Sequence, residues 1–137
     1  MTDISAVRNA LYKEFNTAWA GRTPVQFENQ PFQTPSGAWA RVIVRNEISF
    51  QQSLGAPGSR RYERGGRVLV SIFVPSGSAT NTADEHAEVA RNAFEGKRLT
   101  SPPIRFESSV VVRETGIVED DWHQVVVDAE FVYNEIR

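Results

Sequence analysis

The stretch that decides the fold is residues 66–96, which read GRVLVSIFVPSGSATNTADEHAEVARNAFEG. Residues 67–74 are apolar on both faces and rich in β-branched side chains, and Pro75 follows them. This pattern predicts a central strand that is covered on at least one side. The apolar residues that come next recur at helical spacing and predict a helix: they are Ala83, Ala87, Ala90 and Phe94.

The expected helix is bounded by residue types that favour helix ends. Thr82 is placed to cap the first turn, and Glu85, three residues later, is placed to reach back to the Thr82 amide. Gly96 stands where a left-handed residue after the last turn is favoured. Residues 66–96 therefore predict a strand, a turn and a helix.

A second helix is predicted over residues 4–20. Asp3 is expected to cap it, and Gly21 is expected to end it. Its buried stripe is expected to contain apolar residues at spacings of three and four: Ile4, Val7, Leu11, Phe15 and Ala18.

The remaining apolar segments alternate as strands do, at residues 24–28, 38–50, 104–113 and 122–135. The last two are expected to pair as an antiparallel hairpin across a turn at 114–121, and the proline-containing residues 99–103 are expected to form a link. A chain of 137 residues is the size of one domain. We therefore expect a single domain over residues 1–137, of the α+β class. It would have one antiparallel or mixed sheet of about five strands, with two helices packed on one face.

The strand at 38–50 has two different faces. One face is apolar and predicts core, with Ala40, Val42, Val44 and Ile48. The other face mixes large apolar and charged side chains, namely Trp39, Arg41, Ile43, Arg45 and Glu47. Such a mixture is typical of a protein interface, although a solvated face covered by arginine stems gives the same pattern. We expect Trp39, Arg41, Ile43 and Arg45 to contribute to an interface.

The preceding loop, residues 29–37, contains two prolines and one glycine. Pro31 and Pro35 restrict its backbone. Its apolar Phe32 is expected either to pack on the core of its own chain or to contact a neighbouring molecule. Phe32 is therefore a candidate interaction residue.

Residues 51–66 are rich in Gly, Ser and Gln and carry several arginines. Connections of this length are usually functional or disordered. We expect a flexible basic arm, either solvated or ordered against a partner or nucleic acid. The candidate contact residues are Arg60, Arg61 and Arg64, with Arg67 directly after them.

Composition excludes several classes of protein. The chain has no cysteine, which rules out disulfides and thiolate metal sites, and its net charge of −2 gives no overall attraction to nucleic acid or anionic lipid. No apolar run approaches the roughly 20 residues that span a membrane, and the first residues lack the apolar core of a signal peptide. These features predict a protein of the cytosol, or one assembled there, with no membrane partner.

No catalytic constellation is visible in the sequence. His86 is expected to be a half-buried, hydrogen-bonded residue of a helix, and His123 lies at the start of a strand. The acidic triplet at 119–121 lacks the spacing of a calcium loop. We therefore expect no enzyme activity, no catalytic or metal-binding residues, and no cofactor.

Three motifs in order carry a family resemblance. The first is residues 28–32 (ENQPF) followed by 35–42 (PSGAWARV). The second is 64–66 (RGG) leading into 70–77 (VSIFVPSG). The third is 90–97 (ARNAFEGK). Residues 122–124 (WHQ) and 131–133 (FVY) extend the match. In this order the motifs resemble the tail terminator-like, or tail completion, proteins of long-tailed bacteriophages.

The resemblance implies an α+β subunit that forms a homo-hexameric ring in the virion, at the head-proximal end of the tail. Such a ring caps the tail tube, ends its polymerisation and provides the surface for head-tail joining. Its implied partners are other copies of itself, the tail tube protein, the head-completion or connector protein, and passing DNA in transient, non-specific contact. Assembly would take place in the host cytoplasm.

Two alternatives remain open from the sequence. One is a neck or head-tail connector protein that has no terminator role. The other is a small-molecule-binding α+β domain.

Overall fold

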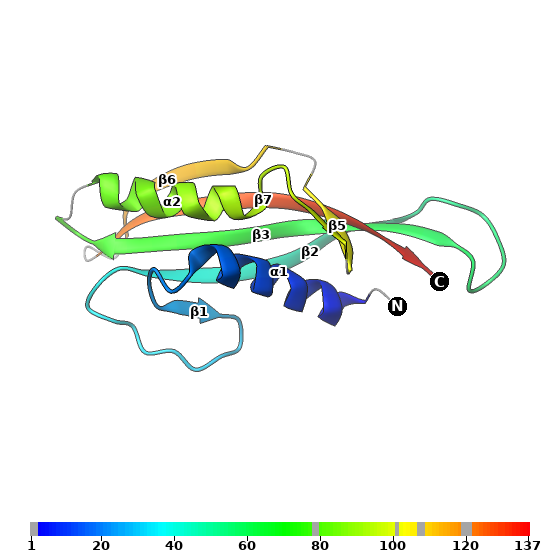
Figure 1. The fold of residues 1–137 in the computed structure, drawn as a ribbon, viewed down its shortest axis with the longest axis horizontal. Helices are drawn as coiled ribbons and strands as arrows, with labels where there is room; N and C mark the ends of the chain where they lie inside the picture. Colours follow the sequence, from blue (N-terminus) through cyan, green and yellow to red (C-terminus); the bar gives the residue numbers. More distant parts are fainter. Residues whose placement is uncertain (1–2, 78–79, 101, 107–108, 119–121) are drawn as a thin grey trace.

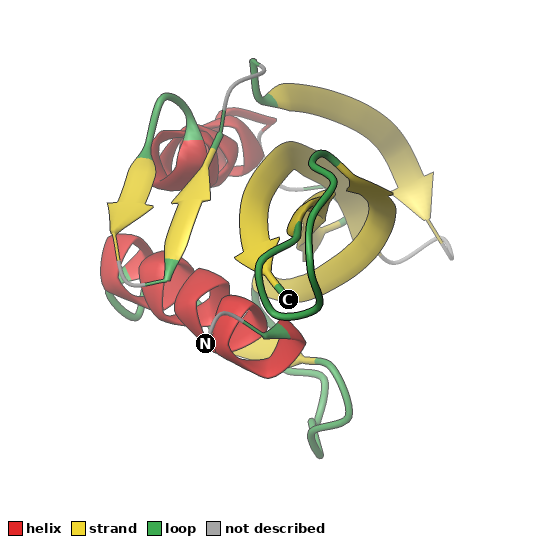
Figure 2. Ribbon diagram, turned by 90° about the vertical axis from the view of Figure 1, so that its right-hand side faces the viewer, coloured by secondary structure: helices red, strands yellow, loops and turns green. Residues whose placement is uncertain are grey.

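The computed structural model describes residues 3–77, 80–100, 102–106, 109–118 and 122–137. In this part of the chain two helices and a seven-stranded mixed sheet form one α+β unit. Both helices lie on the same side of the sheet, as Figure 2 shows along the long axis. The α+β class, the mixed sheet and the two helices on one face are confirmed.

The sheet is built around β3 (Arg61–Pro75), which pairs with β2 (Trp39–Gln51) on one side and with β7 (Trp122–Ile136) on the other. Both pairings are antiparallel, and the pairing with β7 runs from Arg61↔Ile136 to Pro75↔Trp122. Along β3 the side chains of Val68, Val70, Ile72 and Val74 are all buried. The prediction that residues 67–74 form a central strand is confirmed, and β3 is longer than predicted.

The outer strands complete the sheet. The short β1 (Val25–Phe27) runs parallel to β2, which makes the sheet mixed. On the other side, β7 pairs with β6 (Val111–Val118) and, near its end, with β5 (Pro103–Arg105). A last strand, β4 (Arg98–Thr100), forms a hairpin with β5.

The expected count of about five strands is wrong, because the described part of the C-terminal half of the chain contains four strands where two were expected. The proline-containing residues 99–103 belong largely to the β4–β5 hairpin rather than to a link. The strand expected over 104–113 is two strands, with Phe106 leaving the ladder to pack in the core. The turn expected at 114–121 begins later, since a bulge between Glu114 and Gly116 lets β6 continue to Val118. The antiparallel pairing of the last two strands is confirmed.

Helix α1 (Ile4–Trp19) buries a stripe with a spacing of four residues: Val7, Leu11, Phe15 and Trp19. The Asp3 carboxylate accepts a hydrogen bond from the Ala6 amide at 2.7 Å, which confirms the predicted cap. Two expected stripe residues are wrong. Ala18 is exposed because Trp19 takes its place against the core, where it stacks on Phe15. Ile4 is 56% exposed because the first turn projects past the core.

Helix α2 (Thr80–Phe94) confirms the expected apolar face, since Ala83, Ala87, Ala90 and Phe94 are all buried. Gly96 has the expected left-handed φ of 70°. Thr82 does not cap the helix, because the helix already begins at Thr80 and Thr82 lies inside its first turn.

The basic arm expected over residues 51–66 is correct only in part. The connecting loop is residues 52–60, whereas residues 61–66 belong to β3 and pair with both β2 and β7. In Figure 1, these three strands reach past the helices on the right, and the loop forms the far tip. We call this three-stranded projection, residues 46–66 together with 132–137, the arm.

The arm begins at a close contact between two backbones. A Cβ added to Gly66 would lie 1.8 Å from the carbonyl oxygen of Arg45 on β2. The β2 strand is bulged at this point, between Asn46 and Ile48. Only glycine therefore fits at Gly66 while β2 and β3 keep their pairing.

Phe94→Ala tests the packing of α2. Phe94 is completely buried, with its ring centroid 5.2 Å from that of Phe106 and 6.4 Å from that of Phe15. We expect the substitution to lower the free energy of unfolding by about 3–5 kcal/mol, as measured by urea denaturation. Phe50→Ala is the matched control, since Phe50 is 50% exposed, and it should change stability by less than about 1 kcal/mol. Equal effects of the two changes would contradict this packing.

Gly66→Ala tests the backbone contact at the base of the arm. The added methyl group must push β2 and β3 apart, and we expect a loss of about 1–3 kcal/mol in a thermal or urea melt. Gly37→Ala is the control, because a Cβ at Gly37 meets no atom within 4 Å. An unchanged melt for Gly66→Ala would show that the two strands are not in close contact here.

Candidate interaction surfaces

The face of the sheet opposite the helices, which we call the outer face, is crossed by rows of paired residues. Arg41 lies opposite Ser71, Ile43 opposite Leu69, and Arg45 opposite Arg67. On the far side of β3, Ser71, Leu69 and Arg67 pair in turn with Val126, Asp128 and Glu130 of β7. Ile43, Leu69 and Val126 are half-buried, whereas Arg45 is exposed. The outer face therefore mixes apolar side chains with arginines and carboxylates, as the alternation along β2 predicted.

One end of the outer face is an aromatic cluster centred on Trp39, which we define as Phe32, Trp39, Phe73 and Trp122. Trp39 stacks on Phe73 at 4.2 Å between ring centroids, and Phe32 and Trp122 lie at 5.3 and 6.1 Å. Trp39 is only 5% exposed. The loop residue Phe32 is half-buried and packs on Trp39 of its own chain. Trp39 lies beneath the surface of the outer face and supports it.

Arg41 covers the aromatic cluster. Its guanidinium carbon lies 5.4 Å from the ring centroids of both Trp39 and Phe73, and its Nε donates to the Gln26 side-chain oxygen at 3.1 Å. A guanidinium over aromatic faces is attracted by their electron density. Arg41 is thereby held in a defined position on the outer face, beside Ile43 and Arg45.

A buried carboxylate lies in the middle of the outer face. The Asp128 side chain is 3% exposed, and its Oδ2 accepts from Nη1 of Arg67 at 2.9 Å and from Nη1 of Arg113 at 2.7 Å. The Nε of Arg67 also donates to Glu47 at 3.2 Å. The negative charge of Asp128 is the main cause that raises the pKa of Arg67 above its ordinary value. Nothing in the sequence indicated that Arg67 and Arg113 share this carboxylate.

The four arginines at 60–67 do not form one basic cluster. Arg64 points to the helix side and pairs with Glu135 at 3.2 Å, whereas Arg67 lies on the outer face. Strand geometry explains this separation, because residues at odd spacing in a strand point to opposite faces. Arg60 is at the end of the loop, where its backbone exchanges two hydrogen bonds with Arg137 and its Nε donates to the Gly55 carbonyl.

The tip of the arm is apolar as well as basic. Leu54, within the loop, is 94% exposed, and Phe50 and Ile136 near the ends of β2 and β7 are about half exposed. Arg61 is exposed at the start of β3. Exposed apolar side chains gathered on a projection are a frequent feature of contact surfaces.

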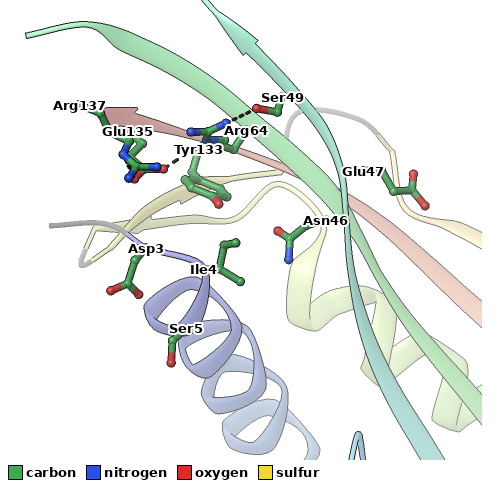
Figure 3. A pocket seen from close by; sticks show the side chains of 10 residues that line it. All are labelled: Asp3, Ile4, Ser5, Asn46, Glu47, Ser49, Arg64, Tyr133, Glu135 and Arg137. Carbon is green, nitrogen blue, oxygen red and sulfur yellow. Dashed lines mark hydrogen bonds and ion pairs between the residues drawn. The ribbon is translucent and has the colours of Figure 1, made fainter. Parts of the chain in front are cut away.

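A groove of about 580 Å³ lies between the start of α1 and the helix side of the arm (Figure 3). Its floor includes Tyr133, and its wall includes the Arg64–Glu135 ion pair. Ile4 projects into it from α1, whereas Glu47 points away from it. Burial is the main cause that raises the pKa of Tyr133. Neither serine that lines the groove, Ser5 or Ser49, has a hydrogen bond to a carboxylate or a histidine within the described part of the chain.

His86 has a structural environment, as the sequence predicted. Its Nδ1 accepts from Nε of Arg22 at 3.2 Å, and its ring lies 5.5 Å from that of Trp19. Burial is the main cause that lowers its pKa, and the charge of Arg22 adds to the effect. His86 therefore joins the end of α1 to α2.

Over the described ranges, no three His, Cys, Asp or Glu side chains are grouped so that they could hold a metal ion. The acidic triplet at 119–121 lies outside the described residues. Neither helix, in the described part, is long and apolar enough to span a membrane.

Comparisons with known proteins agree with this architecture. The fold is similar to that of a solved structure with a TM-score of 0.70, which covers 96% of this chain and 96% of the other at 20% sequence identity. At that identity the likeness concerns the fold alone. Among curated proteins, none matches this chain. The family model described as phage tail terminator protein matches residues 6–131, almost the whole length. The chain therefore belongs to the phage tail terminator protein family.

Proposed function

We propose that copies of this chain form a hexameric ring that caps the tail tube, ends its polymerisation and offers the surface to which the head connector joins. Membership of the tail terminator family gives the chain a role in phage tail assembly and makes it a component of the virion. The further details are the proposal. The observation that carries it is the sheet face without helices, which continues into the projecting arm (Figure 1).

The outer face has the composition of a surface made for another protein. Arg41 is fixed over the aromatic cluster, Ile43 beside it is half-buried, and Arg45 is exposed. Rigid arginines next to apolar side chains are enriched at protein interfaces. Trp39 and Phe32 hold this surface in shape from within. We assign this face to contacts with the tail tube or with neighbouring copies.

The arm is the second contact element of the proposal. Arg60 and Arg61 have no ion pair within the described part of the chain, in contrast to Arg64 and Arg67. A few exposed arginines in each subunit favour weak contacts that salt screens, with passing DNA or with an acidic face of the tube or connector. DNA has to pass through such a ring without being retained, so weak contact suits the task.

The proposed position is the head-proximal end of the tail, reached by assembly in the host cytoplasm. The work requires only shape and binding. The proposal therefore includes no catalytic step and no cofactor.

Particles made without this protein test the terminator role. We expect negative-stain electron microscopy to show tails that exceed the normal length and carry no heads, because nothing stops the tube or joins it to a head. Supplying the wild-type protein from a plasmid is the control and should restore normal tails. Tails of normal length without heads would instead indicate a connector without terminator role. Unchanged particles would indicate neither role.

The double substitution Arg60→Glu and Arg61→Glu tests the arm. Neither side chain has an ion pair in the described chain, and the contact that Arg60 loses, with the Gly55 carbonyl, lies within the loop. We therefore expect a nearly unchanged thermal melt and a lower infectious titre. The control is Lys13→Glu with Lys97→Glu, which changes the net charge equally at two exposed residues outside the arm. Wild-type titre with an unchanged melt would remove the arm from the proposal. Arg64 is unsuitable for this test, because its reversal would place a carboxylate against the buried Glu135.

A further inference from the structure

The outer face carries a line of alternating charges that crosses the sheet from one edge to the other. Its members come from four adjacent strands, in the order Glu47 on β2, Arg67 on β3, Asp128 on β7 and Arg113 on β6. The three distances between charged atoms along the line are 3.2, 2.9 and 2.7 Å. Arg67 and Asp128, in the middle of the line, each form ion pairs with both neighbours. Glu47 and Arg113, at its ends, each form one of these ion pairs.

The two ends of the line have opposite signs and are open to solvent. The side chain of Glu47 is 43% exposed, and that of Arg113 is 56% exposed. The inner members are less accessible, and Asp128 is almost completely buried. The sheet therefore presents an accessible negative charge at one edge and an accessible positive charge at the opposite edge, each with one ion-pair partner inside the subunit.

The β2 edge is open where Glu47 lies. Strand β1 covers β2 only at Ala40–Val42, and side chains then satisfy the backbone of Val44. Its amide donates to Glu28 at 2.8 Å, and its carbonyl accepts from Arg8 at 3.5 Å. Beyond Val44, the described residues supply no backbone partner on this side of β2.

The β6 edge is open in the same way. Just before β6 begins, a side chain satisfies the backbone, since the Val110 amide donates to the Glu95 carboxylate at 3.0 Å. From Val111 onward, the described part of the chain pairs β6 only with β7. Val111 and Val112 lie on opposite faces of this edge strand and are 44% and 39% exposed.

We infer that the β6 edge of one copy lies against the open β2 edge of the next copy, with Arg113 paired to Glu47 across the contact. This inference rests on the proposed ring and adds which parts of the subunit meet. The occupant is a second copy because the two ends of the charge line are complementary to each other. Two β2 edges or two β6 edges would bring like charges together.

This contact has the head-to-tail arrangement that a closed ring requires. The two edges are different surfaces on opposite sides of one sheet, so the contact is head-to-tail and repeats from copy to copy. Hydrogen bonds between edge strands, together with Val111, Val112 and Phe50, would supply most of the affinity. The charge pair would chiefly select orientation and register, because exposed ion pairs contribute little stability by themselves.

Charge reversal followed by mixing tests the pairing. Glu47→Arg alone would bring two arginines together across the contact, and Arg113→Glu alone would bring two glutamates together. We expect each purified variant to fail to form rings on isolated tail tubes, as followed by electron microscopy and by sedimentation at high concentration. In an equimolar mixture each contact of an alternating ring joins opposite charges again, so rings should return to near the wild-type amount.

Mixing separates the contact between copies from changes within one chain. Each variant also replaces an ion pair inside its own subunit by a like-charge contact, with Arg67 or with the buried Asp128, and mixing cannot relieve that contact. Recovery in the mixture therefore reports the contact between copies alone. Thermal melts show whether each variant is folded, and Lys13→Glu is the control for an exposed charge reversal outside both edges.

The outcomes distinguish this inference from the proposed ring. If each variant alone forms rings as the wild type does, the edge pairing is wrong but the proposed ring is supported. If folded variants form no rings even when mixed, the pairing is also wrong. If the wild-type protein forms no ring, either on isolated tail tubes or at high concentration, the proposed ring itself is wrong.

Cross-linking gives a measurement that needs no charge reversal. The chain has no cysteine, so Asn46→Cys with Val112→Cys introduces one thiol at each edge, next to the paired Glu47 and Arg113. A short bis-maleimide should then yield a ladder of covalent multimers from wild-type-like rings. Asn46→Cys with Lys13→Cys is the control and should yield no ladder. Rings that form normally but give no ladder in the first variant would overturn the edge pairing.

Discussion

The pairing of β3 with β7 is the constraint on which the rest of the structure depends. These strands stay in register over fifteen residue pairs without a bulge, from Arg61↔Ile136 to Pro75↔Trp122. Since β2 occupies the other side of β3, the backbone of β3 is bonded along both edges. One face of this unit receives both helices, and the other stays without them. The same pairing continues past the helices and makes the arm a three-stranded extension of the sheet rather than a loose loop.

The outer face shows how a sheet without a helical cover remains ordered. Its aromatic cluster buries Trp39 although no helix covers it, and Arg41 closes that cluster. A buried carboxylate such as Asp128 is stable only when it is paired and hydrogen-bonded, and two arginines meet that need for one of its oxygens. The interactions that hold this face also fix the directions in which its charged groups point. A rigid, patterned surface of this kind suits a protein whose task is to fit others.

Edges present a different problem, because an open strand pairs readily with any other strand. The β2 edge and the β6 edge each carry a bulge, between Asn46 and Ile48 in β2 and between Glu114 and Gly116 in β6. Bulges twist a strand locally and restrict the partners with which it can pair. Glutamates cap the amides of Val44 and Val110 beside these edges. A tail assembly protein must avoid random aggregation and still join its partners at the right moment, and selective edges serve both needs.

The sequence by itself determined the elements with strong local patterns. The β-branched apolar run at 67–74, the stripe from Val7 to Phe15, the Asp3 cap and the glycine after Phe94 each depend on neighbours a few residues away, so a linear pattern is sufficient to place them. The family motifs are also short linear patterns. Only the tertiary structure decided which side chains meet across the sheet, because these contacts depend on pairing between distant strands. It joined Arg113 to Asp128, separated Arg64 from Arg67 onto opposite faces, buried Trp39 under Arg41, and turned residues 61–66 from an expected loop into strand. These outcomes follow from registers between strands that are distant in the chain, and a one-residue change in register would reverse every side chain's face.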